Sequence, residues 1–232
     1  MRIIVTGASR GIGQGIARVL AAAGHRVGLV ARSESLLREL QDELRSAGHD
    51  HVAYAAVDLC DAKETERECV RLSQELGGID ALVNNAGRVI RRSIVEISLE
   101  EWQAVMRTNI DGVFHATRAL LPQLRAQRSG HIINVSSISG RVPLPGGSAY
   151  AASKYAVTGL SESMFHELRD DGIKVSVVFP GSVATESRPT SDDSWKVTPQ
   201  QVGETCLHLL QTAPENCVHS VEIRPLKRPP RS

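Results

Sequence analysis

The sequence predicts an α/β fold: a single doubly wound domain in which helices flank both faces of a seven-stranded, mainly parallel sheet. Short runs rich in β-branched residues alternate with helix-length segments along the whole chain of 232 residues. Several of these runs, such as Ile3-Ile4-Val5 and Ile132-Ile133-Asn134-Val135, are almost continuously apolar. Such runs are typical of strands that are buried on both faces of a parallel sheet.

The expected strands are the apolar runs at residues 2–6, 26–31, 51–57, 81–84, 131–136, 174–179 and 221–224. The expected helices are the segments between them, at residues 11–23, 35–47, 62–76, 100–126, 149–171 and 199–212. In the first helix a stripe with a period of about 3.6 residues is expected to pack on the sheet. Its members are Ile12, Ile16, Val19, Leu20 and Ala23. Residues 1–224 form the predicted domain, and residues 225–232 are expected to be a flexible, basic, proline-rich tail.

Two loop-like segments, residues 141–148 and 186–198, are rich in Pro, Gly, Ser or charge and follow predicted strands. Ligands of open α/β sheets bind outside the carboxyl ends of the strands. We therefore expect both segments to border a ligand site, with residues 186–198 as a short lid.

The composition favours a small-molecule ligand and a cytoplasmic protein. A net charge of +1 gives no basic surplus of the kind that binds nucleic acid or a membrane surface. The four cysteines show no C-x-x-C spacing and are expected to be reduced thiols. The chain starts directly with a predicted strand and has no apolar run of ~18 residues, so neither a cleavable signal nor a membrane span is expected.

A glycine-rich turn, Thr6-Gly7-Ala8-Ser9-Arg10-Gly11-Ile12-Gly13, joins the first strand to the first helix. Glycines let the backbone approach a pyrophosphate, while the helix N-terminus supplies amide donors and a favourable dipole. The spacing is T-G-x-x-x-G-x-G and does not fit G-x-G-x-x-G, which would require glycine at Ile16. The turn predicts a dinucleotide site, with a purely structural tight turn as the alternative.

This spacing resembles the cofactor loop of the short-chain dehydrogenase/reductase family, a family of Rossmann-type oxidoreductases, and further family motifs follow in order over roughly residues 2–185. Asn84-Asn85-Ala86-Gly87 resembles the element beside the adenosine half of the cofactor. Asp58 matches the position that binds the adenine amine, and Pro180-Gly181-Ser182-Val183-Ala184-Thr185 resembles the segment that holds the nicotinamide carboxamide. An Asn/Gly turn is the alternative for residues 84–87.

Together the turn and the resemblance imply one set of cofactor-binding residues. They are Gly7, Ser9, Arg10, Gly11, Ile12, Gly13, Arg32, Asp58, Leu59, Asn85, Ala86, Gly87, Tyr150, Lys154, Pro180, Gly181, Val183 and Thr185.

The charges after the second strand favour NADP(H) over NAD(H). An NAD site needs a carboxylate about 20 residues past the glycines, but the second strand ends in Ala31-Arg32-Ser33. Arg32 and Arg10 are instead suited to charge-assisted bonds with a 2′-phosphate, and both resemble the basic determinants of NADP-preferring family members. The alternatives are that these arginines are solvated surface residues, or that Glu34 binds a ribose.

Tyr150 and Lys154 predict proton-transfer chemistry. They are four residues apart in a helical pattern, so their side chains leave the helix on one face. A free tyrosine has a pKa of ~10, and a neighbouring ammonium lowers the pKa by favouring the phenolate. Tyr150 is therefore a candidate general acid and base.

The resemblance adds two catalytic residues. Ser137 lies 13 residues before Tyr150, which is the family spacing, and would bind the substrate oxygen; Ser136 is the alternative. Asn109 matches the family asparagine that positions a water and the lysine in a proton relay, although an isolated asparagine is more often a helix-interrupting or capping residue.

The implied reaction interconverts a carbonyl and a secondary alcohol by hydride transfer, with Asn109, Ser137, Tyr150 and Lys154 as the catalytic set. The substrate is a small molecule whose identity stays open among ketones, 3-ketoacyl thioesters and polyols. The family resemblance also implies a homodimer or homotetramer built on the two long helices at residues 100–126 and 149–171.

Three other interpretations fit the sequence less well. A dinucleotide-sensing regulator without catalysis would be expected to lack one of the catalytic residues, all of which are present. A Rossmann-type methyltransferase leaves Y-x-x-x-K and P-G-x-V-x-T unexplained. A metal site at His49-Asp50-His51 lacks further ligands of suitable spacing and lies on the loop side opposite the predicted cofactor.

Overall fold

A computed structural model describes residues 1–143, 145–186 and 192–227. Seven parallel strands form one sheet in the order β3-β2-β1-β4-β5-β6-β7, which confirms the predicted fold class. The strands are β1 (Arg2–Thr6), β2 (Arg26–Ala31), β3 (Val52–Ala56), β4 (Ala81–Asn84), β5 (Gly130–Val135), β6 (Ile173–Pro180) and β7 (Ser220–Ile223). The chain reverses direction across the sheet between β1 and β4, the switch point where doubly wound sheets bind ligands.

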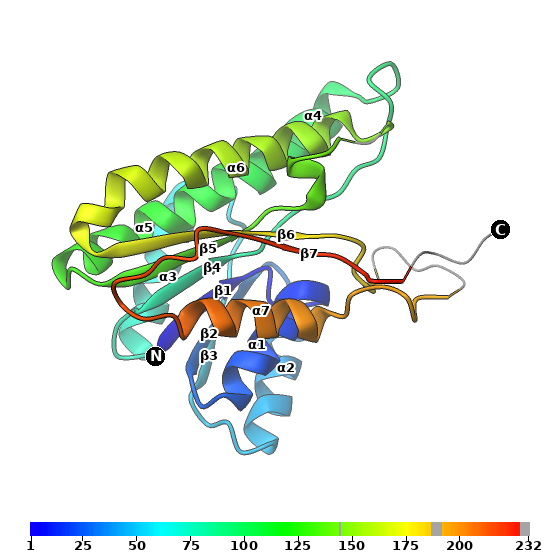
Figure 1. Ribbon diagram of the computed structural model, residues 1–232. Coiled ribbons are helices and arrows are strands. Elements are labelled where there is room, and N and C mark those ends of the chain that lie inside the picture. The colour runs from blue at the N-terminus through cyan, green and yellow to red at the C-terminus, as the bar shows by residue number, and fades with distance from the viewer. Residues whose placement is uncertain (144, 187–191, 228–232) are drawn as a thin grey trace.

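Helices cover both faces of the sheet (Figure 1). One face carries α1 (Gly11–Ala22), α2 (Glu34–Ser46) and α7 (Pro199–Leu210). The other carries α3 (Ala62–Glu75), α5 (Gly112–Ala126) and α6 (Ser148–Leu168), with α4 (Leu99–Met106) preceding α5. Short helical turns are η1 (Arg107–Asp111), η2 (Ile138–Gly140) and η3 (Arg169–Asp171).

The core has two layers, one on each side of the sheet, because successive side chains of a strand point to opposite faces. In β1, Ile3 and Val5 belong to the layer under α1 and α7, whereas Ile4 belongs to the layer under α3 and α5. All three side chains are fully buried. Burial on both faces explains why the run is continuously apolar.

The expected single helix at residues 100–126 is wrong, since this stretch is divided into α4, the π-helix η1 and α5. A π-turn holds an extra residue and is common at functional sites. Here it accompanies the inward placement of Asn109, whose fully buried side chain bonds other segments of the chain. The apolar pattern of the flanking residues does not reveal such an insertion.

Strands β1, β2 and β4 have the expected boundaries, and those of the other elements differ from the expected ones by at most three residues. The expected burial of Ala23 is also wrong, because α1 ends at Ala22 and the exposed Ala23 forms the C-cap before Gly24, which has a φ of 79°. Leu144, residues 187–191 of the expected lid and residues 228–232 of the expected tail lie outside the described residues.

Candidate active site

The glycine-rich turn lies between β1 and α1 at the carboxyl edge of the sheet. Gly7 and Gly11 have φ values of 66° and 57°, a region that L side chains rarely adopt. The backbone of Arg10 is extended, and its side chain makes no capping hydrogen bond to α1. The first turn of α1 also carries no acidic residue. The amides and the positive dipole end of the helix N-terminus are therefore suited to an anionic group.

Gly13 lets α1 approach this turn closely. A Cβ atom at Gly13 would lie 2.2 Å from the Gly7 carbonyl oxygen and 2.5 Å from Asn85 Nδ2. Similarly, a Cβ atom at Gly7 would lie 2.7 Å from Ala86 Cα. The spacing of the glycines thus has a steric cause, because the turn, the helix and the loop after β4 meet at contact distance.

The loop after β4 is bonded to the end of β1. Thr6 Oγ1 accepts hydrogen bonds from the backbone N–H groups of Asn85 at 3.0 Å and Ala86 at 3.1 Å. The amide Nδ2 of Asn85 donates to the Thr6 carbonyl at 3.1 Å. Asn84, which ends β4, is buried and donates to Asn134 of β5. Residues 84–87 are therefore held to β1 and β5 by hydrogen bonds and do not form an isolated turn.

The charged residues predicted for the cofactor lie around this junction. Arg10 and Arg32 are exposed, and Arg32 directly follows β2. Asp58 accepts a 3.0 Å hydrogen bond from the backbone N–H of Cys60. This bond lowers the pKa of Asp58, the positive charges of Arg32 and Arg107 act in the same direction, and burial opposes them. Arg32 and Asp58 are thus near neighbours on adjacent strand ends.

The other predicted cofactor contacts are also at this edge. Leu59 is buried, and its carbonyl is 2.8 Å from Nδ1 of His115 on α5. Ile12 packs against the core, and Ser9 is half-buried in the turn. Glu34, the alternative ribose ligand, instead accepts hydrogen bonds from Arg38 at 2.9 Å and from Tyr54 at 3.3 Å.

The segment after β6 runs along the same edge. Gly181 donates its backbone N–H to Ile223 of β7, and Val183 forms an isolated parallel bridge with Val197. A Cβ atom at Gly11 would lie 3.4 Å from the Thr185 methyl group, so residues 181–185 reach the glycine-rich turn. The two predicted halves of a dinucleotide site therefore meet in the structure.

Tyr150 and Lys154 lie in the first turns of α6, as predicted. The Nζ atom of Lys154 is 5.9 Å from the centre of the Tyr150 ring. Lys154 is buried, and its ammonium donates to the Val135 carbonyl at 2.8 Å. Burial lowers the pKa of Lys154 to about 8, since few groups replace the water that would solvate the charge. The site thus places an incompletely solvated cation beside a phenol.

Asn109 is placed next to this pair by the π-helix. Its Oδ1 accepts from the Arg88 backbone N–H at 2.7 Å, and its Nδ2 donates to the Arg88 carbonyl at 3.1 Å. A Cβ atom at Gly87 would lie 3.5 Å from Asn109 Oδ1 and 3.7 Å from Lys154 Nζ. Asn109, Gly87 and Lys154 therefore converge on one point.

Sequence reasoning missed Ser153, which is fully buried between the two predicted catalytic positions of α6. Its hydroxyl accepts a 2.8 Å hydrogen bond from Asn109 Nδ2 and donates to the Tyr150 carbonyl at 2.7 Å. The available signal was a serine on the inner face of α6, three residues after Tyr150. Ser153 thereby links the π-helix to the helix that carries Tyr150.

Ser137 and Ser136 differ in availability. Ser136 is buried and donates to the Lys154 carbonyl at 3.0 Å, a bond internal to the fold. Ser137 is half-buried and caps η2, where its Oγ accepts the Ser139 backbone N–H at 3.1 Å. The hydroxyl proton of Ser137 remains a donor for a substrate oxygen, which favours Ser137 over Ser136.

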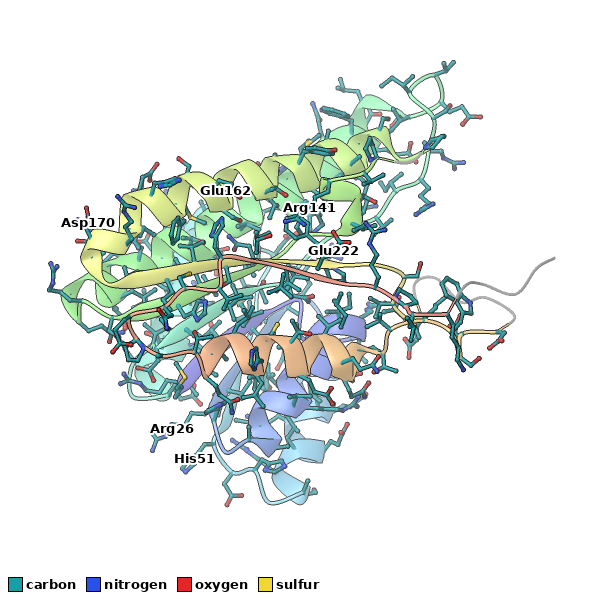
Figure 2. All side chains as sticks on the ribbon, in the orientation of Figure 1. Arg26, His51, Arg141, Glu162, Asp170 and Glu222 are labelled. Atoms are coloured by element: carbon teal, nitrogen blue, oxygen red, sulfur yellow. The ribbon has the colours of Figure 1, made fainter. Side chains whose placement is uncertain are left out.

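Two further features are a histidine pair and a surface groove. His51 lies near Arg26, at the edge where β2 begins (Figure 2). A surface groove of about 1060 Å³ runs between α3, α5 and Asp171. Within residues 1–143, 145–186 and 192–227, no group of three or more His, Cys, Asp or Glu residues is arranged to hold a metal ion. None of the described helices is both long and apolar enough to cross a membrane.

The fold defines a Rossmann-type α/β protein whose glycine-rich turn lies at the carboxyl edge of the sheet. The chain belongs to the short-chain dehydrogenase/reductase family, because the family model for short chain dehydrogenase matches residues 1–195. An uncharacterized oxidoreductase of Staphylococcus saprophyticus is 36% identical over 228 residues, which is 96% of each chain.

Solved structures agree with this assignment. An alcohol dehydrogenase from the archaeon Thermococcus sibiricus, complexed with 5-hydroxy-NADP, has a TM-score of 0.91 and 28% identity over 100% of both chains. Serine dehydrogenase from Escherichia coli has a TM-score of 0.89 and 30% identity, covering 99% of this chain and 100% of that chain. The chain is thus an oxidoreductase of this family, which confirms the resemblance read from its motifs.

Proposed function

We propose that the protein is an NADP(H)-dependent reductase or dehydrogenase that interconverts a small carbonyl compound and a secondary alcohol. One observation carries the proposal: a buried ammonium is held 5.9 Å from the ring centre of Tyr150, at the edge where the glycine-rich turn lies. This arrangement gives a proton donor and the cation that tunes it.

The residues at this edge fit a dinucleotide. Added Cβ atoms at Gly7 and Gly13 would collide with neighbouring backbone, so only glycine lets the turn, α1 and the loop after β4 pack this closely. The N-terminal amides of α1 suit the pyrophosphate, and residues 180–185 suit the nicotinamide end. The bound cofactor supplies or accepts the hydride.

The chain's own residues would handle the proton. In the reductive direction, Tyr150 donates its phenolic proton to the carbonyl oxygen as that oxygen gains negative charge. Ser137 donates a hydrogen bond to the same oxygen. Lys154 lowers the pKa of Tyr150, and its remaining N–H donors can hold ribose hydroxyls. Asn109 and Ser153 fix the helix that carries both residues, and Asn109 connects it to the proton relay.

A screen of NADPH oxidation against diverse ketones, 3-ketoacyl thioesters and sugar-like carbonyls, with matched NADH controls, tests this function. We expect turnover with at least one carbonyl class and a lower rate with NADH. Dinucleotide binding without turnover on any substrate would support the alternative, a catalytically silent dinucleotide sensor. No dinucleotide binding would refute both.

The proposed preference for NADP(H) rests on two exposed residues, Arg10 in the glycine-rich turn and Arg32 directly after β2, which are suited to bind a 2′-phosphate. The T. sibiricus relative is complexed with an NADP derivative, which supports the same preference. Hydrogen bonds to charged groups contribute about 1.5–3 kcal/mol, so Arg32→Asp should shift the NADP(H)/NAD(H) ratio of kcat/KM by about 10- to 100-fold toward NAD(H). Steady-state kinetics with both cofactors measure this ratio, and an unchanged ratio would refute the assignment.

We also infer a homodimer or homotetramer of a single domain, residues 1–224, located in the cytoplasm. Phe114 on α5 and Tyr155 on α6 are 48% and 44% exposed, and the groove along α5 offers an apolar contact surface. All four cysteines are free thiols, in keeping with a reducing compartment. Light scattering after size-exclusion chromatography measures the assembly, and a monomer at micromolar concentration would contradict it.

A further inference from the structure

Arg141 lies directly after the turn that carries Ser137, and it is engaged on both its backbone and its side chain. One side of this turn is fixed to α6. A Cβ atom at Gly140 would lie 2.6 Å from Ser136 Oγ and 2.8 Å from the Lys154 carbonyl oxygen. The Arg141 carbonyl then accepts a hydrogen bond from the hydroxyl of Tyr155.

The side chain of Arg141 extends the other way, to the last two strands of the sheet. Its guanidinium stacks over the ring of Phe179, 3.9 Å from the ring centre, and Phe179 is fully buried. Nη1 is 3.4 Å from Glu222 Oε2, and Nη2 donates to the hydroxyl of Ser220. Figure 2 shows Arg141 and Glu222 lying next to each other. Since Phe179 and Glu222 are paired across β6 and β7, Arg141 covers one cross-strand pair.

This placement links two parts of the site that the strands leave separate. Phe179 comes just before Pro180, where the segment predicted to hold the nicotinamide begins. Arg141 comes four residues after Ser137, the predicted donor to the substrate oxygen. β5 and β6 are joined up to the bond between the Ser136 N–H and the Val178 carbonyl. Beyond that bond, the Arg141 side chain connects the turn that carries Ser137 with the end of β6.

We propose that Arg141 is a positioning residue that fixes the Ser137 turn against the nicotinamide segment at the end of β6, and so sets the alignment of the substrate oxygen. The inference rests on the proposed function. A guanidinium suits this task because its plane stacks on an aromatic face while its edge bonds a carboxylate. A lysine would retain the charge without the planar stack.

The expected signature separates alignment from stability. Arg141 and Glu222 are 42% and 28% exposed in their side chains, and ion pairs of this kind contribute little to folding. Misalignment of reacting groups, by contrast, costs rate steeply. Loss of Arg141 should therefore lower kcat clearly. The melting temperature and the affinity for NADPH should change little.

A double-mutant cycle between Arg141→Met and Ser137→Ala tests the inference. Arg141→Met should lower kcat by about tenfold and leave the NADPH dissociation constant within about twofold. In the Ser137→Ala background the same substitution should lower kcat by less than about twofold, because Arg141 acts through Ser137. Arg141→Lys should recover part of the loss. Amide hydrogen exchange at residues 137–142 should accelerate in Arg141→Met, which is a readout independent of turnover.

The opposing outcomes are distinct. The role of Arg141 would be overturned if the two substitutions lowered kcat independently, so that their effects multiplied in the double variant. Unchanged amide hydrogen exchange at residues 137–142 in Arg141→Met would also overturn it. Either result would leave the reductase function intact. Absence of turnover by the unaltered chain, despite NADPH binding, would overturn the proposed function and with it the catalytic part of this inference.

Discussion

Two regions at the carboxyl edge of the sheet are built in opposite ways. The glycine junction, residues 6–13 and 84–87, is held by backbone contacts and by hydrogen bonds to Thr6, whose side chain is 1% exposed. The outer loops, residues 89–98, 142–143 and 145–147, carry apolar side chains in solvent: Val95 is 90%, Ile94 69% and Val142 51% exposed. Both regions border the proposed site, yet only the first is fixed by close backbone contacts.

This difference in packing indicates which part of the proposed function the fold determines. In the proposed function the junction and the first turns of α6 hold the cofactor and the proton donor, and Cβ atoms added at Gly7 and Gly13 would meet backbone at contact distance. The outer loops, which would face the substrate, meet few atoms and tolerate many sequences. A reaction class therefore follows from this structure, while the substrate depends on side chains that the fold constrains weakly.

The largest expected effect is at Tyr150. Tyr150→Phe should lower kcat by about 10²- to 10⁴-fold, the usual contribution of a positioned general acid or base. Affinity for NADPH should stay within about twofold, since the phenyl ring is retained. Stopped-flow reduction and fluorescence titration measure the two quantities.

Tyr54→Phe is the matched control, because Tyr54 lies on β3 and bonds Glu34 through its hydroxyl. It should keep most of the activity. Substantial turnover by Tyr150→Phe would remove Tyr150 from the mechanism and would leave the fixed junction as a binding site only.

The next effect concerns the steric fit of the junction itself. Gly13→Ala places a methyl group 2.2 Å from the Gly7 carbonyl, so backbone must move, and overpacking of this kind costs about 1–3 kcal/mol. We expect a loss near the upper end, measured by urea unfolding, together with weaker NADPH binding.

The same change at Gly159 is the control, because an added Cβ at that position of α6 meets nothing within 4 Å. Alanine is favoured over glycine in a helix by about 1 kcal/mol, so Gly159→Ala should stabilise the protein slightly. Equal effects at the two glycines would show that the junction is less tightly determined than its distances indicate.

Much of the fold and of the glycine junction could be predicted from the sequence. The apolar run Ile3-Ile4-Val5 and the glycine spacing reflect burial and contact, which leave a periodic or local trace in the chain. The cofactor and catalytic positions predicted from the motifs lie together at one edge, although their roles stay predictions. Here local pattern and tertiary contact agree.

What escaped prediction depends on contacts between distant segments. The π-helix at Arg107–Asp111 contains Asn109, which forms hydrogen bonds with Arg88 and Ser153. The apolar periodicity of the sequence predicts neither the π-helix nor these bonds. The sequence predicts that Arg141 begins a loop-like segment beside a ligand site, but it does not predict the contacts of its side chain with Phe179 and Glu222. Such residues are recognised only when the partners, far away in sequence, are seen together.

The last predicted effect is a pH dependence of the free energy of unfolding, which arises from Lys154 on α6. Burial lowers the pKa of Lys154 to about 8 from its ordinary 10.5, so the buried charge disfavours the folded apoprotein. Below pH 8 this cost is fully present; between about 8 and 10.5 the unfolded chain binds more protons than the folded one, and stability rises with pH. From pH 7 to 9.5 the apoprotein should gain on the order of 2 kcal/mol relative to Lys154→Met, whose side chain does not titrate. Urea unfolding of both proteins at the two pH values measures the difference. A constant difference would mean that Lys154 is solvated or paired in the apoprotein, and that α6 is as open as the outer loops.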